Sequence, residues 1–162
     1  MPVEEAELVA SYRRVEHPLY NALYRMLWDA QECQDMIHDA YLRLWQRRGR
    51  VDACRIDALA WTAALNLARN RMRWRRLRGW PAPPEAVEEL AGGDDPQASA
   101  EQASLHAALR RLPVAMLEVV LMAEFSGMSG REIAQVLGIP EGTVASRRHS
   151  AVRRLKEMLG ER

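Results

Sequence analysis

The stretch from Ser129 to Arg154 constrains the fold of this chain most strongly, because it has the pattern of two short helices joined by a tight turn. Ser129 and Glu132 have the spacing of a capping box at the start of the first helix. Gly138 can adopt the left-handed conformation that ends a helix, and Pro140 suits the first turn of the next helix. The pattern therefore predicts a helix-turn-helix whose second helix would lie in a DNA major groove.

This second helix has an apolar side and a polar side. At about 100° per residue, the side expected to pack inward carries Val144, Ala151, Val152, Leu155, Met158 and Leu159, with Arg148 among them. Arginine can pair with guanine edges, and Ser or Thr can bond bases or phosphates. The candidate DNA contacts are Thr143, Ser146, Arg147, His149, Ser150 and Arg153. Two core helices with a basic outer face remain the simpler alternative.

Charge and cysteine content narrow the function classes. The formal net charge is +1, and the basic residues are almost all arginine: Lys156 is the only lysine among 23 of them. Arginine suits phosphate and base-edge recognition better than lysine does. Cys33 and Cys54 match no metal-ligand spacing, so we expect no metal and no cofactor. No signal peptide or membrane-spanning run is apparent, which predicts a cytoplasmic protein without membrane insertion.

The N-terminal part has helical periodicity throughout. We expect a helix over Glu4–Val15, an interruption at Pro18, and a second helix to about Trp28. A third helix, Glu32–Trp45, carries an acidic stripe formed by Glu32, Asp35 and Asp39. The stripe is either a solvated face or a docking surface for a basic partner. Nothing places these carboxylates in a pocket, so acid–base catalysis is not supported.

A basic loop over Gln46–Arg55 leads into a long helix, Ile56–Arg78. Its outer stripe is formed by Asn66, Arg69, Asn70 and Arg73, and six arginines lie between residues 69 and 78. Asparagine can bond base edges, and Trp74, among these arginines, could stack on a base. The density of arginine favours nucleic-acid binding over the alternative, an exposed basic helix end.

The composition changes abruptly over residues 80–101, which contain six acids, no Lys or Arg, and several prolines and glycines. This composition predicts a flexible acidic linker. Beyond it, helices are expected over Ala103–Leu112 and Val114–Phe125, separated by Pro113. The predicted fold is all-α: two small helical domains, residues 1–79 and 102–162, joined by that linker, with the helix-turn-helix in the second domain.

Three segments in this order resemble the extracytoplasmic-function (ECF) sigma factors of the bacterial sigma-70 family, over nearly the whole chain. The segments are ECQDMIHDAYLRLW (Glu32–Trp45), LAWTAALNLARNRMRWRR (Leu59–Arg76) and LPVAMLEVVLMAEFSGMSGREIAQVLGIPEGTVASR (Leu112–Arg147). The family pattern differs at Gln34, His38, Leu59, Ala145 and Ser150. The docking surface is therefore less acidic than in the family pattern. The promoter sequence that this chain recognises cannot be inferred from the family.

The resemblance implies a promoter-specificity subunit that directs transcription initiation. It assigns docking on core RNA polymerase (the β′ clamp and the β subunit) to Glu32, Asp35, His38, Asp39 and Leu42. It assigns the minus-ten promoter element to the Asn66–Arg73 stripe and the minus-thirty-five element to the helix from about Pro140. Promoter DNA and an anti-sigma factor are the other partners it implies.

Two alternatives remain open. A stand-alone helix-turn-helix regulator that binds duplex DNA as a dimer would have a similar C-terminal half, but would not need the acidic helix or the Asn66/Asn70 stripe. An enzyme would need a catalytic or metal-binding cluster, and no His/Asp/Glu pattern of that kind is present. We therefore expect a protein with no catalytic residues.

Overall fold

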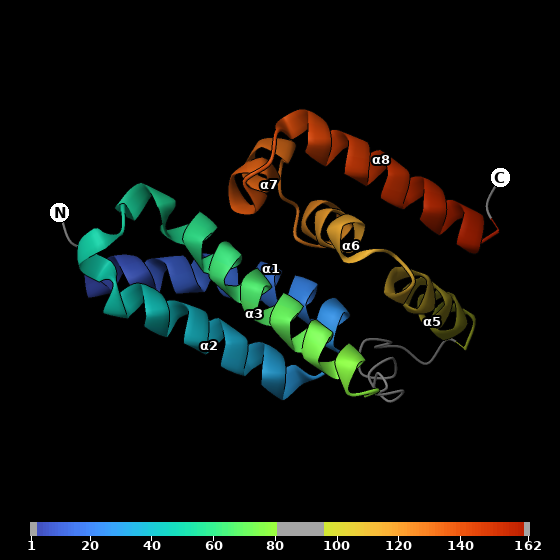
Figure 1. The fold of residues 1–162 in the computed structure, drawn as a ribbon, viewed down its shortest axis with the longest axis horizontal. Helices are drawn as coiled ribbons and strands as arrows, with labels where there is room; N and C mark the ends of the chain where they lie inside the picture. Colours follow the sequence, from blue (N-terminus) through green and yellow to red (C-terminus); the bar gives the residue numbers. More distant parts are fainter. Residues whose placement is uncertain (1–2, 81–95, 161–162) are drawn as a thin grey trace.

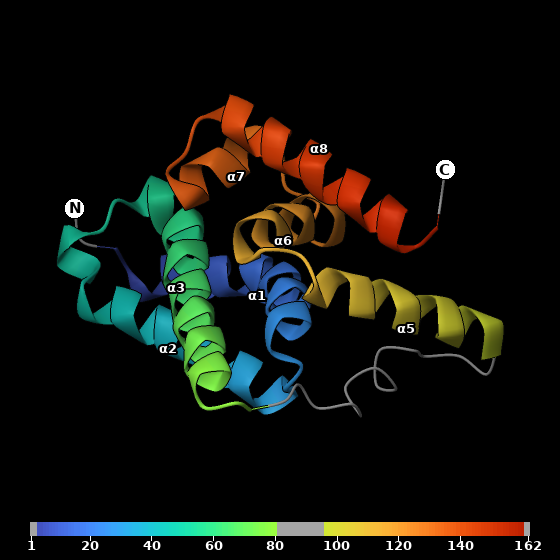
Figure 2. The same ribbon diagram turned by 45° about the vertical axis from the view of Figure 1, so that its right-hand side comes forward.

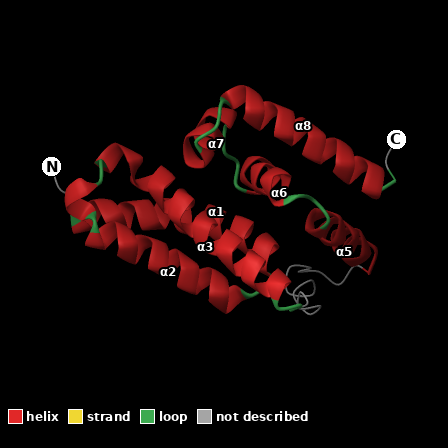
Figure 3. Ribbon diagram, in the orientation of Figure 1, coloured by secondary structure: helices red, strands yellow, loops and turns green. Residues whose placement is uncertain are grey.

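The computed structural model describes residues 3–80 and 96–160, and within these residues every regular element is helical (Figures 1 and 3). The all-α prediction is confirmed. The N-terminal unit consists of α1 (Glu5–Leu27), α2 (Ala30–Gln46), the short 3₁₀ helices η1 (Arg48–Arg50) and η2 (Ala53–Arg55), and α3 (Ile56–Leu77). The C-terminal unit consists of α5 (Pro96–Arg110), α6 (Val114–Val120), the π-helical turn η3 (Leu121–Phe125), α7 (Gly130–Leu137) and α8 (Glu141–Met158).

Helix α1 is continuous, so the predicted interruption at Pro18 is wrong. A proline inside a helix costs about 3 kcal/mol, because it removes one backbone hydrogen bond and its ring crowds the preceding turn. Val15 and Leu19, on either side of Pro18, are buried in the same core. Burying one such side chain contributes about 1.5–3 kcal/mol, so the packing of both halves outweighs the proline.

Helices α1, α2 and α3 form the core of the N-terminal unit, where α3 packs against both of the others. Helix α3 has the predicted length, and its buried face contains Ile56, Ala60, Trp61, Ala64 and Leu65. Part of the predicted loop before α3 forms the short helices η1 and η2. The Asp52 side chain caps η2 by accepting a hydrogen bond from the Cys54 backbone at 3.0 Å.

The helix-turn-helix forms as predicted. The Ser129 side chain accepts the Glu132 amide at 3.1 Å while the Glu132 carboxylate accepts the Ser129 amide, which completes the capping box. Gly138 ends α7 with φ 66°, a conformation that favours glycine because it has no Cβ. In α8, Val144 and Ala151 are buried, whereas Arg148 is exposed and pairs with Glu124 of η3. Leu159 lies beyond α8 and is exposed, so its predicted inward packing is wrong.

Helix α5 begins at Pro96, inside the segment predicted to be the linker, and runs as one helix to Arg110. The rest of the predicted linker, residues 81–95, lies outside the described residues. Pro113 separates α5 from α6 as expected. None of the described helices is long and apolar enough to cross a membrane.

The two units pack against each other, and their buried side chains form one continuous apolar cluster. Helix α6 lies between α8 and the N-terminal unit in both views (Figures 1 and 2). Helix α7 contacts α3, and η3 contacts α1. The Ser126 hydroxyl donates to the Pro18 carbonyl at 2.8 Å, and the Thr62 hydroxyl donates to the Val136 carbonyl at 3.0 Å. One side of α3 is therefore covered by the C-terminal unit.

Candidate nucleic-acid interface

The predicted minus-ten residues lie on one stripe of α3, spaced by three or four positions as one helix face requires. Asn66, Asn70 and Arg73 are exposed, and Arg69 is half-buried. The Arg69 Nη1 donates to the Asn66 side-chain oxygen at 2.7 Å. The two side chains are thus linked: the Asn66 side-chain oxygen has a partner within the protein, and this bond does not engage the Asn66 side-chain NH2 group.

Glu118 of α6 engages this stripe directly. Both oxygens of its carboxylate accept hydrogen bonds from Arg69. Nη2 donates to Oε2 at 3.0 Å, and Nε donates to Oε1. The Glu118 side chain is only 5% exposed, while that of Arg69 is 34% exposed. A two-point arginine–carboxylate pair is strong and fixes both side chains in orientation. The C-terminal unit therefore holds one of the candidate DNA-binding arginines.

Sequence reasoning missed Glu118, although a signal was present. The residue stands in an otherwise apolar run, VAMLEVVLMA, between Leu117 and Leu121, which are both buried. A carboxylate in such a position is almost never buried without a partner. The partner, Arg69, lies 49 residues away in sequence and could not be identified without the fold.

Half of the predicted minus-thirty-five residues of α8 are exposed, and the other half are partly accessible. Ser146, His149 and Arg153 are exposed, while the other three are half-buried: Thr143, Arg147 and Ser150. The Arg153 guanidinium lies 3.4 Å from the Glu157 carboxylate, and both side chains are more than half exposed. Such a surface pair is weak, about 0.3–0.5 kcal/mol, so Arg153 can exchange this partner for a phosphate. The polar side of α8 therefore faces outward, as the helix-turn-helix pattern predicts.

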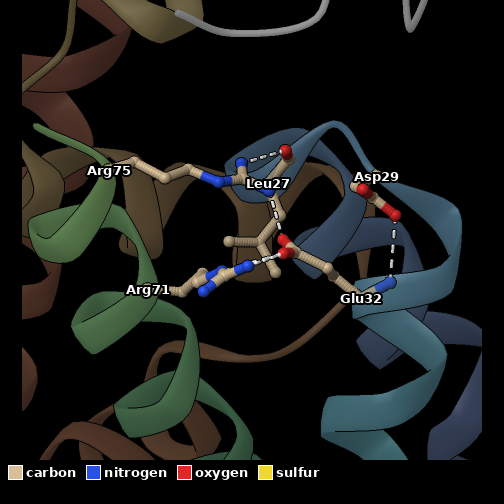
Figure 4. Close-up of polar contacts among 5 residues, drawn as sticks. All are labelled: Leu27, Asp29, Glu32, Arg71 and Arg75. Atoms are coloured by element: carbon tan, nitrogen blue, oxygen red, sulfur yellow. Dashed lines mark hydrogen bonds and ion pairs between the residues drawn. The ribbon is translucent and has the colours of Figure 1, made fainter. Parts of the chain in front are cut away.

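The acidic stripe of α2 is divided by the fold, because Glu32 turns toward α3. The carboxylate of Glu32 accepts a hydrogen bond from Arg71 Nε at 2.8 Å and forms an ion pair with Arg75 (Figure 4). Arg75 also donates to the Leu27 carbonyl at the end of α1. The Glu32 amide is in turn capped by the Asp29 carboxylate at 3.0 Å. These contacts tie the start of α2 to α3 and to the end of α1.

The other predicted docking residues of α2 face outward. Asp35 is exposed and accepts the Gln31 amide group at 2.9 Å, and Asp39 lies 3.3 Å from Arg43. His38 is exposed and stacks on Tyr12, with ring centroids 6.0 Å apart. Leu42 is 53% exposed, so it adds an apolar group to this surface. These four residues form an accessible acidic and apolar surface.

Metal and thiol chemistry have little support in the described residues. No three His, Cys, Asp or Glu side chains gather there in a way that could hold a metal ion. Cys33 is buried, and this burial raises the pKa of its thiol to about 12, so the thiol stays protonated at neutral pH. Cys54 is exposed.

Comparison with known proteins identifies the family. The family profile described as "Sigma-70, region 4" matches residues 102–155. The ECF RNA polymerase sigma factor SigL of Mycobacterium tuberculosis is 32% identical over 172 aligned positions, which cover 98% of this chain and 92% of SigL. The chain belongs to the ECF RNA polymerase sigma factors. The RNA polymerase sigma-E factor of Streptomyces coelicolor is also similar, at 29% identity over 96% of this chain and 88% of the relative.

Two solved structures share the fold of this sigma factor. CnrH in complex with the cytosolic domain of CnrY matches with a TM-score of 0.73 and 21% identity, over 97% of this chain and 90% of CnrH. The sigma factor RpoE of Bartonella quintana, in complex with the anti-sigma factor NepR, matches with a TM-score of 0.67 and 20% identity, over 96% of both chains. Both alignments span the two units.

Proposed function

We propose that this sigma factor binds core RNA polymerase through α2, the minus-ten promoter element through α3 and the minus-thirty-five element through α8. The observation that carries the proposal is the alignment with SigL, which extends over both units. A dimeric helix-turn-helix regulator is not favoured, since it would not require α1–α3 to match a sigma factor. In this proposal residues 1–79 and 102–162 act as separate functional domains.

The polymerase-binding surface consists of Asp35, His38, Asp39 and Leu42. The carboxylate of Glu32 is engaged by two arginines, so we assign to Glu32 the positioning of α2. The surface combines carboxylates with an exposed leucine, a combination suited to a partner surface with basic and apolar groups.

The promoter-binding surfaces differ in accessibility. On α8, Thr143, Ser146, Arg147, His149, Ser150 and Arg153 would contact duplex DNA. On α3, Asn66, Arg69, Asn70 and Arg73 would contact the minus-ten element. Asn66, Asn70 and Arg73 are exposed, but Glu118 holds Arg69, so the complete stripe can meet DNA only after the C-terminal unit moves away from Arg69. The described arrangement is therefore a closed form, and the promoter-binding form is open.

An anti-sigma factor is a further proposed partner, because a solved structure of similar fold contains one. The protein would act in the bacterial cytoplasm, where polymerase and promoter DNA are found. It would have no catalytic activity of its own and would need no metal or cofactor.

A pull-down with core RNA polymerase tests the docking surface. Changing both Asp35 and Asp39 to lysine should abolish binding, because it reverses the charge of the proposed surface. The fold should be unaffected, since exposed substitutions typically change the free energy of unfolding by under about 0.5 kcal/mol. The control is Glu5→Lys with Glu157→Lys, which changes the net charge equally at exposed positions outside α2. Unchanged core binding by the α2 variant would refute the docking assignment.

A further inference from the structure

A cavity of about 590 Å³ lies where the ends of α1 and α3 meet the connection between α5 and α6. Its cationic lining comes from both units: Arg25, Arg69, Arg73, Arg75, Arg76 and Arg110. Its apolar lining includes Met26, Leu112 and Leu117. None of the described residues that line the cavity is acidic.

Two of these arginines have carboxylate partners within the protein, because Arg69 pairs with Glu118 and Arg75 shares Glu32 with Arg71. No carboxylate of the described residues pairs with Arg73, Arg76 or the remaining two arginines, Arg25 and Arg110. Among the residues that the structure describes, four guanidinium groups at the cavity therefore have no carboxylate partner.

Arg25 shows most clearly that this charge is poorly compensated. Its Nη1 donates to the Asn21 carbonyl at 2.9 Å, and its guanidinium lies 4.2 Å from the centre of the Phe125 ring. Its buried Nε has no hydrogen-bond partner among the described residues. Burial lowers the pKa of Arg25, because the charged form has lost much of its hydration. The guanidinium of Arg110, which also lines the cavity, lies 4.5 Å from the centre of the Trp28 ring.

We propose that this cavity binds a small polyphosphate ligand that carries an aromatic ring, namely a nucleoside triphosphate. Guanidinium groups match phosphate oxygens in a two-point geometry, and several phosphates can use several arginines. The apolar lining and the exposed Trp80 at the cavity provide surfaces for a base. The volume lies within the range of about 300–1,000 Å³ that is typical of small-molecule sites.

The site has a direct consequence for the closed form. Its walls belong to both units, so the complete site exists only while the units are packed together. A ligand that binds only the closed form stabilises that form by RT ln(1 + c/Kd), where c is the free ligand concentration, so the effect grows with that concentration. This consequence rests on the proposed function, because only a promoter-binding protein would be inhibited by it. The binding itself does not rest on that function.

Isothermal titration calorimetry with the full chain tests the site, using GTP, tripolyphosphate and orthophosphate as ligands. We expect saturable one-to-one binding of GTP, weaker binding of tripolyphosphate and none of orthophosphate. Arg110→Gln should weaken GTP binding by about 10-fold or more, as expected for the loss of a charged hydrogen bond. The matched control is Arg13→Gln, an exposed arginine of α1 twelve positions from Arg25, or about 18 Å along the helix. It should change GTP affinity by less than about twofold, because a distant surface charge contributes little.

Arg76→Gln is the second variant, chosen because Arg76 is exposed and its replacement should leave the fold intact. It should also weaken GTP binding, with an unchanged circular dichroism spectrum. Three results would overturn the proposal: no saturable heat with GTP, equal losses in the Arg13 and Arg110 variants, or equal affinity for GTP and tripolyphosphate. Binding of a short single-stranded oligonucleotide or a glutamate-rich peptide, with none of GTP, would also overturn it and would assign the arginines to a macromolecular partner.

Discussion

The contact between Arg69 and Glu118 gives the sharpest energetic prediction. In Arg69→Met the long apolar stem is largely kept, but the Glu118 carboxylate loses its partner while remaining buried. Removing one partner of a buried ion pair costs about 3–5 kcal/mol. Because the Arg69 side chain is 34% exposed, water reaches one side of the pair. We therefore expect a loss nearer about 2–3 kcal/mol.

The chain offers a matched control for this substitution. Arg148 pairs with Glu124 inside the C-terminal unit, and these side chains are 53% and 43% exposed. Arg148→Met should cost less than about 1 kcal/mol, as is usual for surface pairs. Adding Glu118→Leu to Arg69→Met should recover at least half of the loss, because no unpaired charge then remains buried.

Urea unfolding at 25 °C, followed by circular dichroism, measures these free energies. Small-angle X-ray scattering should show an increased radius of gyration for Arg69→Met, because the weakened contact joins the two units. The reasoning is refuted if Arg69→Met is no more destabilising than Arg148→Met. It is also refuted if the double variant is less stable than Arg69→Met alone.

Two further predictions concern single buried groups. Burial and two neighbouring arginines lower the pKa of His106, which packs against Trp28 with ring centroids 4.9 Å apart. Near pH 6.5 the unfolded chain therefore binds a proton at His106 more readily than the folded chain does, so the free energy of unfolding should fall as the pH drops from 7.5 to 5.5. The variant His106→Leu should show a smaller fall. Urea unfolding midpoints at the two pH values measure this difference. A disulfide reagent should modify the exposed Cys54 and should leave the buried Cys33 unmodified until urea is added. Mass spectrometry of the native protein should then find one modified thiol, and two modified thiols would contradict the prediction.

Local signals in the sequence predicted most of the helices. The capping residues Ser129 and Glu132, the left-handed Gly138 and the apolar period of α3 each act within one or two helical turns. Pro18 misled the prediction, because its local preference is overridden by burial on both sides, which only the assembled core supplies.

The accessibility of the candidate surfaces could not be predicted from such local signals. The stripe on α3 and the polar side of α8 follow from helix periodicity alone. Their accessibility depends on contacts between distant residues, such as Glu32 with Arg75 and Arg69 with Glu118, which are 43 and 49 positions apart. Sequence patterns identify which face of a helix is polar, but they do not say which partner covers it.

The division of labour between the two DNA-binding surfaces is the central claim, and promoter opening tests it most directly. The assay combines the sigma factor with core polymerase on a promoter selected from genomic DNA, and measures permanganate reactivity of unpaired thymines. Losing one good base contact costs about 1–3 kcal/mol. Arg147→Ala should therefore weaken binding to the closed duplex, whereas Asn66→Ala with Asn70→Ala should leave duplex binding largely intact and reduce thymine reactivity. Equal loss of duplex affinity in both variants, with no strand opening by the unaltered protein, would contradict the claim.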